Sequence, residues 1–355
     1  MKEARLLLGG KWCASGVLAL SLAITGFSCG TAAAQSADDE PTPLKLKLRP
    51  QVDASSLTGG TLFNAQIQPT KAASGTRKLA ERTHAGKASG AGGFGNGVEF
   101  YPGDLSFQGD GYTGVRYLQT TVSHDIYVNC DASCFGHPGT FLTKLGNSQF
   151  IHLTDQYVGT SAGHRYTVGQ GGTIEYPVTT GTPLGPLDIL TLVYTAAAYF
   201  GTGSGHVYHI YFAPGIDVCA DSKLTVCYSP DNLPTWYFCA FHSSVDFTDI
   251  GHTLFTVEPF QNVNGCNVQQ PSPNGSLVDS TMDVLSHELF ETITDPDGYG
   301  WWNSFDLDLG GYEIGDECQD YNFGYSNINL AGTPYEIQPE YSNAQHACAT
   351  RPTED

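Results

Sequence analysis

Eight cysteines downstream of an export signal constrain this chain more than any other feature of its sequence. The first 34 residues begin with basic side chains, continue through an apolar stretch from Val17 to Phe27 that is too short to cross a bilayer, and end in small residues before Gln35. This pattern is typical of a cleaved signal peptide over residues 1–34, and a lipoprotein signal acylated at Cys29 is the alternative. We therefore expect a secreted protein, extracellular or periplasmic.

An oxidising compartment favours disulfides, and an even number of cysteines remains after cleavage. The candidates are Cys130, Cys134, Cys219, Cys227, Cys239, Cys266, Cys318 and Cys348. A cysteine-ligated metal site is the alternative, but it would use CxxC pairs, which the sequence lacks. We expect Cys318 to pair with Cys348 and Cys239 with Cys266, because each pair brackets a segment that contains no other cysteine.

The charge of the chain excludes several classes of partner. Its 355 residues include 16 Lys and Arg against 36 Asp and Glu, a formal net charge of −20. A chain this acidic has no basic surface that could follow a nucleic-acid backbone. No apolar run of about 18 residues follows the N-terminal signal, so we expect no membrane span once the signal is removed.

The charge also divides the mature chain into two parts. Residues 36–95 carry eight basic side chains against five acidic ones, whereas residues 96–355 carry five against thirty. The first part has few large apolar residues and ends in a Gly-, Ala- and Ser-rich run, so it is not expected to bury enough surface to offset its ordering entropy. We interpret residues 35–95 as a basic, low-complexity pro-segment that docks on an acidic domain, or as a linker; a disordered spacer is the alternative.

Residues 96–355 are expected to form one α+β domain. Short runs rich in Tyr, Val and Thr, separated by Gly and Pro, predict strands at 114–122, 173–178, 207–212, 236–241 and 254–257. A first helix is predicted from Pro186 or Leu187 to about Phe200. A second is predicted from Asp279 or Ser280 to the Asp295-Pro296 pair, with Met282, Leu285, Leu289 and Ile293 along one apolar face.

The second helix carries an HExxE motif, from His287 to Glu291. Residues four apart project from the same face of a helix, so His287 and Glu291 can bind one cation together. Glu288 is offset by about 100° and can flank the ion as a general base. HExxH metallopeptidases place two zinc ligands and a general base on a helix with the same spacing. Here a carboxylate replaces the second histidine, and zinc accepts both ligand types.

A third ligand is expected from the downstream segment FDLDLGGYEIGDEC. Glu313 lies 22 residues after Glu291, far enough for the chain to leave the helix and return. Asp316 would then hold His287 through the second ring nitrogen of that histidine. Glu317 and Asp306 are alternative ligands at this stage.

The runs SHELFETITDP, Trp301-Trp302, EIGDEC and FCAFHSS resemble secreted proteins of the EXORDIUM / phosphate-induced protein 1 family and their bacterial relatives. The resemblance extends from about Tyr208 to the C-terminus. It implies a secreted, cysteine-containing domain with a zincin-like active-site helix. It also implies an alternative function, because some plant members lack the His-Glu pair and are regarded as wall proteins; this sequence keeps His287, Glu288 and Glu291.

Three other features are weaker indications of function. Residues 159–163 match the GxSxG motif of serine hydrolases, but a strand-like run follows where that motif requires a helix. His242, close to Cys239, is expected to be structural, with a role as a ligand or substrate contact as the alternative. Asp306, Asp308 and Asp320 offer oxygen ligands for Ca²⁺, with an exposed acidic loop as the alternative.

These inferences combine into one expectation. Residues 96–355 form a disulfide-braced, metallopeptidase-like domain of α+β, zincin-like architecture, with a mixed sheet and an active-site helix. One Zn²⁺ is bound by His287, Glu291 and Glu313, and Glu288 is the catalytic base for hydrolysis of an extracellular protein, peptide or wall polymer. The alternative is a non-catalytic, extracellular wall- or carbohydrate-binding protein of EXORDIUM type.

Overall fold

The computed structural model describes residues 40–57, 66–69, 103–159, 165–268, 271–303, 313–319 and 326–353. These residues belong to one compact unit, Ala37–Asp355. The expected signal peptide, residues 1–34, lies outside the described residues and stays a prediction. Among the residues that the structure describes, no helix combines the length and the apolarity that crossing a bilayer requires.

The centre of the fold is a mixed sheet of eight strands. The path across it is β1 (Leu44–Lys45), β6 (Gly172–Ile174), β4 (Thr121–Val128), β7 (His206–Phe212), β11 (Gly251–Glu258), β10 (Phe238–Phe247) and β2 (Gln66–Pro69), and β5 (Tyr166–Val168) also pairs with β4. β4, β7 and β11 run parallel to one another, whereas β10 is antiparallel to β11, with His242 opposite Thr256. The predicted α+β class with a mixed sheet is confirmed.

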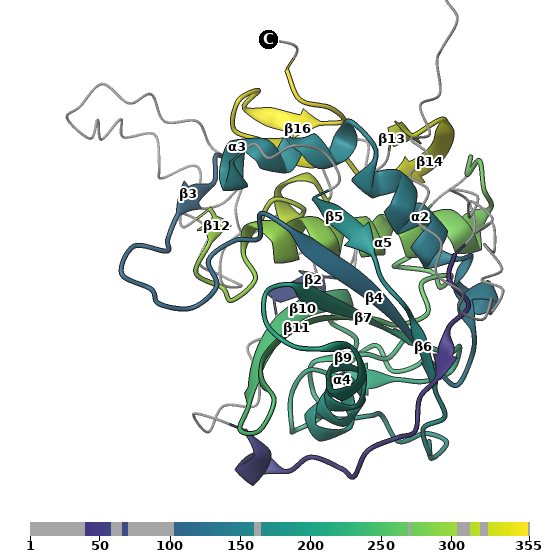
Figure 1. The fold of residues 1–355 in the computed structure, drawn as a ribbon. Coiled ribbons are helices and arrows are strands. Elements are labelled where there is room, and N and C mark those ends of the chain that lie inside the picture. Colours follow the sequence, from purple (N-terminus) through teal and green to yellow (C-terminus); the bar gives the residue numbers. More distant parts are fainter. Residues whose placement is uncertain are drawn as a thin grey trace, which may run out of the picture. The chain divides into compact units, whose positions relative to one another are not determined.

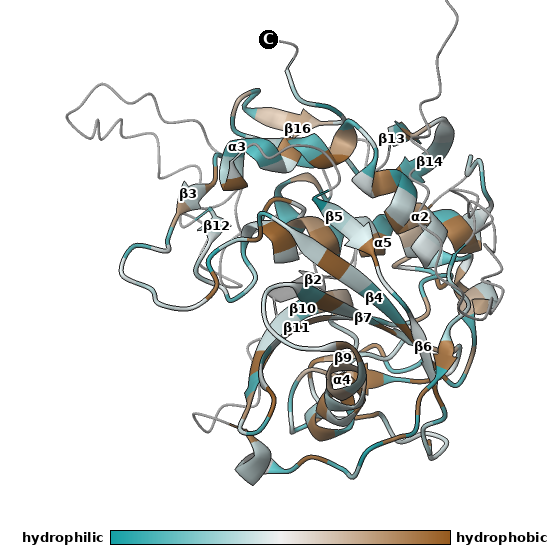
Figure 2. Ribbon diagram, viewed as in Figure 1, coloured by the Kyte–Doolittle hydropathy of each residue, from teal (hydrophilic) through white to brown (hydrophobic). Residues whose placement is uncertain are grey.

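Helices cover both faces of this sheet (Figure 1). Alternate side chains of a strand point to opposite faces, and on β7 Ile210 belongs to the core cluster beside α4 (Pro186–Phe200) while Tyr211 belongs to the cluster beside α2 (Pro138–Gly146) and α5 (Ser276–Thr294). Both α4 and α5 contain hydrophobic residues, brown in Figure 2. The sheet is therefore buried on both faces, and α5 packs against β10 and β11.

Shorter elements complete the described part of the chain. They are α3 (Asp155–Val158), the 3-10 helices η1 (Ala54–Ser56), η2 (Ala132–Phe135), η3 (Phe150–Thr154) and η4 (Asp316–Cys318), and the strand pairs β3 (Ser106–Phe107) with β12 (Trp301–Trp302), β8 (Val218–Cys219) with β9 (Cys227–Tyr228), β13 (Ser326–Leu330) with β14 (Thr333–Ile337), and β15 (Glu340–Ser342) with β16 (Ala347–Ala349).

Both predicted helices form. α4 begins at Pro186, whose fixed φ suits the first helical position, and the carboxylate of Asp188 accepts a hydrogen bond from the N–H of Gly185, 2.9 Å away. α5 begins at Ser276, three or four residues before the predicted start. Every side chain of α5 from residue 279 to residue 294 is buried, so the face opposite its apolar stripe is covered as well. That second buried face carries the HExxE motif.

One strand prediction was wrong. The strand expected at 114–122 lies instead at Thr121–Val128, as β4. The reason is that the first half of β4 carries polar side chains that are nevertheless buried, and the fold satisfies them with specific partners. The hydroxyl of Tyr211, for example, donates to Asp125 across 2.8 Å, and the two ring nitrogens of His124 contact the Gln170 carbonyl oxygen and His206.

Residues 35–95 were expected to bury too little surface to fold by themselves, and the part that the structure describes packs on the rest of the domain. Leu46, Val52 and Leu57 lie in the core beside α4, and β1 and β2 extend the sheet at its two ends. Buried threonines of α4 accept hydrogen bonds from the backbone of this segment. The N–H of Val52, for example, donates to Thr191 Oγ1 across 3.0 Å. The folded unit therefore includes residues upstream of 96.

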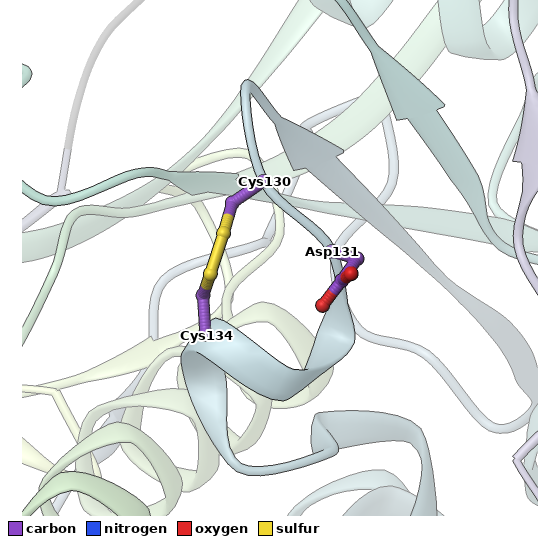
Figure 3. A group of neighbouring side chains, drawn as sticks. All are labelled: Cys130, Asp131 and Cys134. Atoms are coloured by element: carbon purple, nitrogen blue, oxygen red, sulfur yellow. A yellow bond between two sulfur atoms is a disulfide. The ribbon is translucent and has the colours of Figure 1, made fainter.

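The eight cysteines from Cys130 to Cys348 lie in four disulfide pairs. These are Cys130–Cys134 (Figure 3), Cys219–Cys227, Cys239–Cys266 and Cys318–Cys348. Both pairings predicted from the spacing are confirmed. The last pair connects η4 to β16, and so fixes the segment that follows Glu313. Asp131 lies beside the first pair and caps η2 by accepting a hydrogen bond from the N–H of Ser133. The neighbouring side chains of Cys130, Asp131 and Cys134 therefore have structural roles and are not assigned to a metal site.

Candidate metal centre

A cluster of buried histidines and carboxylates lies where α5, β10 and the segment before η4 meet. α5 contributes the HExxE residues, β10 contributes a histidine, and residues 313–319 contribute two carboxylates. The six side chains, each at most 8% exposed, are His242, His287, Glu288, Glu291, Glu313 and Asp316. Residues from distant parts of the sequence thus form one buried polar cluster.

The first half of the cluster centres on His287. Its Nε2 lies 2.9 Å from Glu291 Oε1 and 3.8 Å from Asp316 Oδ1. One donor atom from each of the three residues lies within 4.8 Å of the others, close enough for a single cation to contact all three. The N–H of Asp316 donates to Glu291 Oε1 across 3.2 Å, which holds the η4 segment against α5.

Gly315 lets that segment approach the imidazole ring. A Cβ added at this glycine would lie only 2.6 Å from Nδ1 of His287 and 2.8 Å from its Cγ, well inside van der Waals contact. The backbone before Asp316 therefore covers the face of the ring. Any side chain at residue 315 would displace either the ring or the segment that carries Asp316.

The second half of the cluster centres on His242. Its neighbour Phe241 belongs to the core beside α4, so the alternation of β10 directs His242 to the opposite face, toward α5. His242 Nδ1 lies 3.4 Å from both Glu288 Oε2 and Glu291 Oε2, and its Nε2 lies 3.7 Å from Glu313 Oε1. The sequence favoured a structural histidine here, with a ligand as the alternative, and the structure brings His242 to the two motif glutamates.

The structure also places the other candidate ligands. Glu313, the expected third ligand, lies beside His242, whereas Asp316 lies beside His287. Glu317 is half-buried, and its Oε1 accepts a hydrogen bond from the side-chain amide of Asn303 across 2.7 Å. The remaining candidates lie outside the described residues, namely Asp306, Asp308, Asp320 and residues 160–163 of the GxSxG motif.

The two motif glutamates have opposite pKa shifts. Burial, together with the neighbouring Glu291, raises the pKa of Glu288 to about 7. Burial acts in the same direction on Glu291, but the charges and contacts of His287 and His242 outweigh it and hold the pKa of Glu291 at about 2. Burial alone would lower the pKa of His242, yet Glu288 and Glu291 raise it to about 10. The pKa of Glu288 therefore lies near neutral pH, the range in which a carboxyl group exchanges protons most readily under physiological conditions.

Further buried acids surround the cluster. Glu258, at the end of β11, and Glu340, in β15, are at most 1% exposed, and burial raises the pKa of each well above its usual value. Among the described residues, neither carboxylate oxygen of Glu288 or Glu340 has a hydrogen-bond partner. Buried carboxylates without donors are costly unless a cation or a proton compensates them. The donor set, with imidazole nitrogen as well as carboxylate oxygen, fits a transition-metal ion such as zinc.

Comparisons of the chain with known protein families, with curated proteins and with solved structures gave no match. The functional interpretation therefore rests on the residues of this chain and their geometry, and the resemblance to the EXORDIUM family stays a prediction.

Proposed function

We propose that this protein is a secreted, zinc-dependent hydrolase of the metallopeptidase type, with a zincin-like arrangement of its active-site helix. The observation that carries the proposal is the buried group of His287, Glu291 and Asp316, whose donor atoms lie within 4.8 Å of one another, next to the buried carboxylate of Glu288. The helix that bears HExxE packs on a mixed sheet next to its antiparallel strand β10, which supports the architectural part of the proposal.

The donor chemistry favours zinc over calcium at this position. Calcium takes six to eight oxygen ligands, whereas His287 offers a nitrogen. The side chain of His287 is fully buried and lies against Gly315. From the sequence alone, Glu313 was the expected third ligand, with Glu317 and Asp306 as alternatives and Asp316 as the partner of the second ring nitrogen of His287. The distances favour Asp316, because it is the carboxylate of this segment that lies nearest to His287 and Glu291.

The chain's own residues suit general-base hydrolysis. A zinc ion, when bound, supplies Lewis acidity to a water molecule and to the carbonyl of the substrate. Glu288 follows His287 directly on α5, so its carboxylate flanks the ligand group. Its pKa of about 7 allows it to accept a proton from the attacking water and to return it to the leaving amine at neutral pH. Burial of the cluster keeps bulk water from screening these charges.

Metal content and peptide hydrolysis test this proposal together. We expect the mature protein, supplied with one equivalent of zinc, to retain one ion on dialysis and to cleave members of a fluorogenic peptide library. Glu288→Gln should retain that ion and lose at least about 100-fold in kcat, because the base is removed while the ligands stay. Glu175 is an exposed carboxylate distant in sequence from Glu288, and Glu175→Gln is the matched control. It should change neither the zinc content nor kcat.

Two further variants locate the third ligand. Asp316→Ala should weaken zinc binding more than Glu313→Ala does; the reverse order would assign the ligand to Glu313. A wild-type protein that retains no transition metal after zinc is supplied would refute the metal site. Retention of zinc without hydrolysis of any peptide would favour the non-catalytic wall-binding alternative.

A further inference from the structure

We propose that His242, Glu288 and Glu291 form a second cation site, and that an ion bound there takes the catalytic base out of the reaction. The site itself stands on its own geometry. Its effect on catalysis rests on the proposed function, because that function assigns Glu288 as the base. The ligand is a divalent transition-metal ion, since one nitrogen and two carboxylates provide the donors.

The spacing of the three donors suits one cation. His242 Nδ1 lies 3.4 Å from Glu288 Oε2 and 3.4 Å from Glu291 Oε2, and the three atoms lie within 4.8 Å of one another. Tetrahedral ligands at about 2.1 Å from zinc are separated by about 3.4 Å. All three side chains are at most 1% exposed, so the donors are held inside the protein and not at its surface.

The orientation of the His242 ring is the second observation. Its Nε2 lies 3.2 Å from the backbone carbonyl oxygen of Asp295. A carbonyl oxygen only accepts hydrogen bonds, so Nε2 must carry the proton that this contact uses. In the neutral ring, Nδ1 then presents its lone pair to two carboxylates, so either a metal cation or a proton must occupy the position between them.

Buried polar atoms without hydrogen-bond partners also lie at this proposed second site. Within the described residues, His242 Nδ1 and both carboxylate oxygens of Glu288 have no hydrogen-bond partner. A cation bonded to Nδ1 and to one oxygen of Glu288 would compensate atoms that otherwise stay buried without a donor or acceptor. A protonated His242 is the competing arrangement, and it would leave the protein with one metal site.

The two sites can be filled at the same time because they use opposite oxygens of Glu291. Oε1 faces His287 and Asp316, whereas Oε2 faces His242. Glu291 would then bridge the two ions. Glu288 belongs to the second group alone, and while its Oε2 is bound to an ion it cannot accept a proton. Activity should therefore rise with the first equivalent of zinc and fall as the second site fills.

The test is zinc stoichiometry of the mature, full-length protein, measured by equilibrium dialysis and elemental analysis over a range of free zinc. We expect two ions per chain in the wild type and one in His242→Asn. His346→Asn is the matched control and should bind two, because His346 is exposed, contacts Asp104 outside the cluster, and has a φ of 51° that asparagine tolerates. Near-ultraviolet circular dichroism checks that each variant is folded.

Each outcome decides the question. One ion in both the wild type and His242→Asn would overturn the second site and leave the proposed function standing. No ion in the wild type would overturn the proposed function as well. If His242→Asn does not fold, Glu288→Gln takes its place: it should bind one ion, and two ions in that variant would overturn the assignment of Glu288 as a ligand.

Discussion

The buried carboxylate of Glu288 should make the metal-free protein less stable at neutral pH than it would be with a neutral side chain. Its pKa is raised from 4.5 to about 7, so folding favours the protonated form. This contribution to stability is fully present below pH 4.5 and is lost as the pH rises to 7. A shift of about 2.5 units corresponds to about 3 kcal/mol in the free energy of unfolding.

Replacement of Glu288 by glutamine removes this ionisation and keeps the shape of the side chain. In the presence of a chelator, Glu288→Gln and the wild type should be equally stable at pH 4.5. At pH 8 the variant should be more stable by less than about 3 kcal/mol, or less than about 6 °C in melting temperature for a chain of this size, because the substitution also removes a carboxylate that stabilises protonated His242. Differential scanning calorimetry at both pH values measures the difference.

The surface variant Glu175→Gln controls for the loss of one negative charge from an acidic protein, and should show no such dependence on pH. If Glu288→Gln gains no stability between pH 4.5 and pH 8, or is destabilised equally at both, Glu288 does not carry a buried, raised-pKa carboxyl. The assignment of a general base poised near neutrality would then fail with it.

Other parts of the structure make separate predictions. Gly315→Ala should weaken zinc binding by at least about 10-fold in a titration, because its Cβ would collide with the ring of His287; unchanged affinity would contradict the packing described for that segment. Replacing Cys318 and Cys348 together by alanine should cost about 3–4 kcal/mol of unfolding free energy in a denaturant titration, since a 30-residue separation is closed by that bond. Deletion of residues 40–57 should lower the melting temperature, because the segment contributes buried core side chains, whereas a detachable linker would leave it unchanged.

Local patterns made several elements predictable. The apolar stripe and the HExxE spacing of α5 depend only on helical geometry, and Pro186 together with Gly201 brackets α4 in the same way. The pairing of Cys318 with Cys348 followed from spacing alone. For the two helices the deciding interactions lie within a turn of the residues concerned, and for the disulfide the absence of another cysteine between the two partners was enough.

The misses share a different cause. β4 was missed because its buried polar residues look like a loop until their partners on other strands are known. Residues 40–57 looked too polar to fold because their few apolar side chains are buried by α4 and not by one another. A sequence pattern shows the polarity of each residue, but whether the residue is buried depends on contacts with distant parts of the chain.

The candidate site divides along the same line. The sequence by itself determined that His287, Glu288 and Glu291 share a helix and can act together on a cation, because residues four apart must lie on one face. Only the tertiary structure decided that His242 of β10 completes the cluster and that Asp316, rather than Glu313, lies beside His287. Those choices depend on how a strand and a loop pack on α5, and the distances that settle them exist only after the chain has folded around the buried charges.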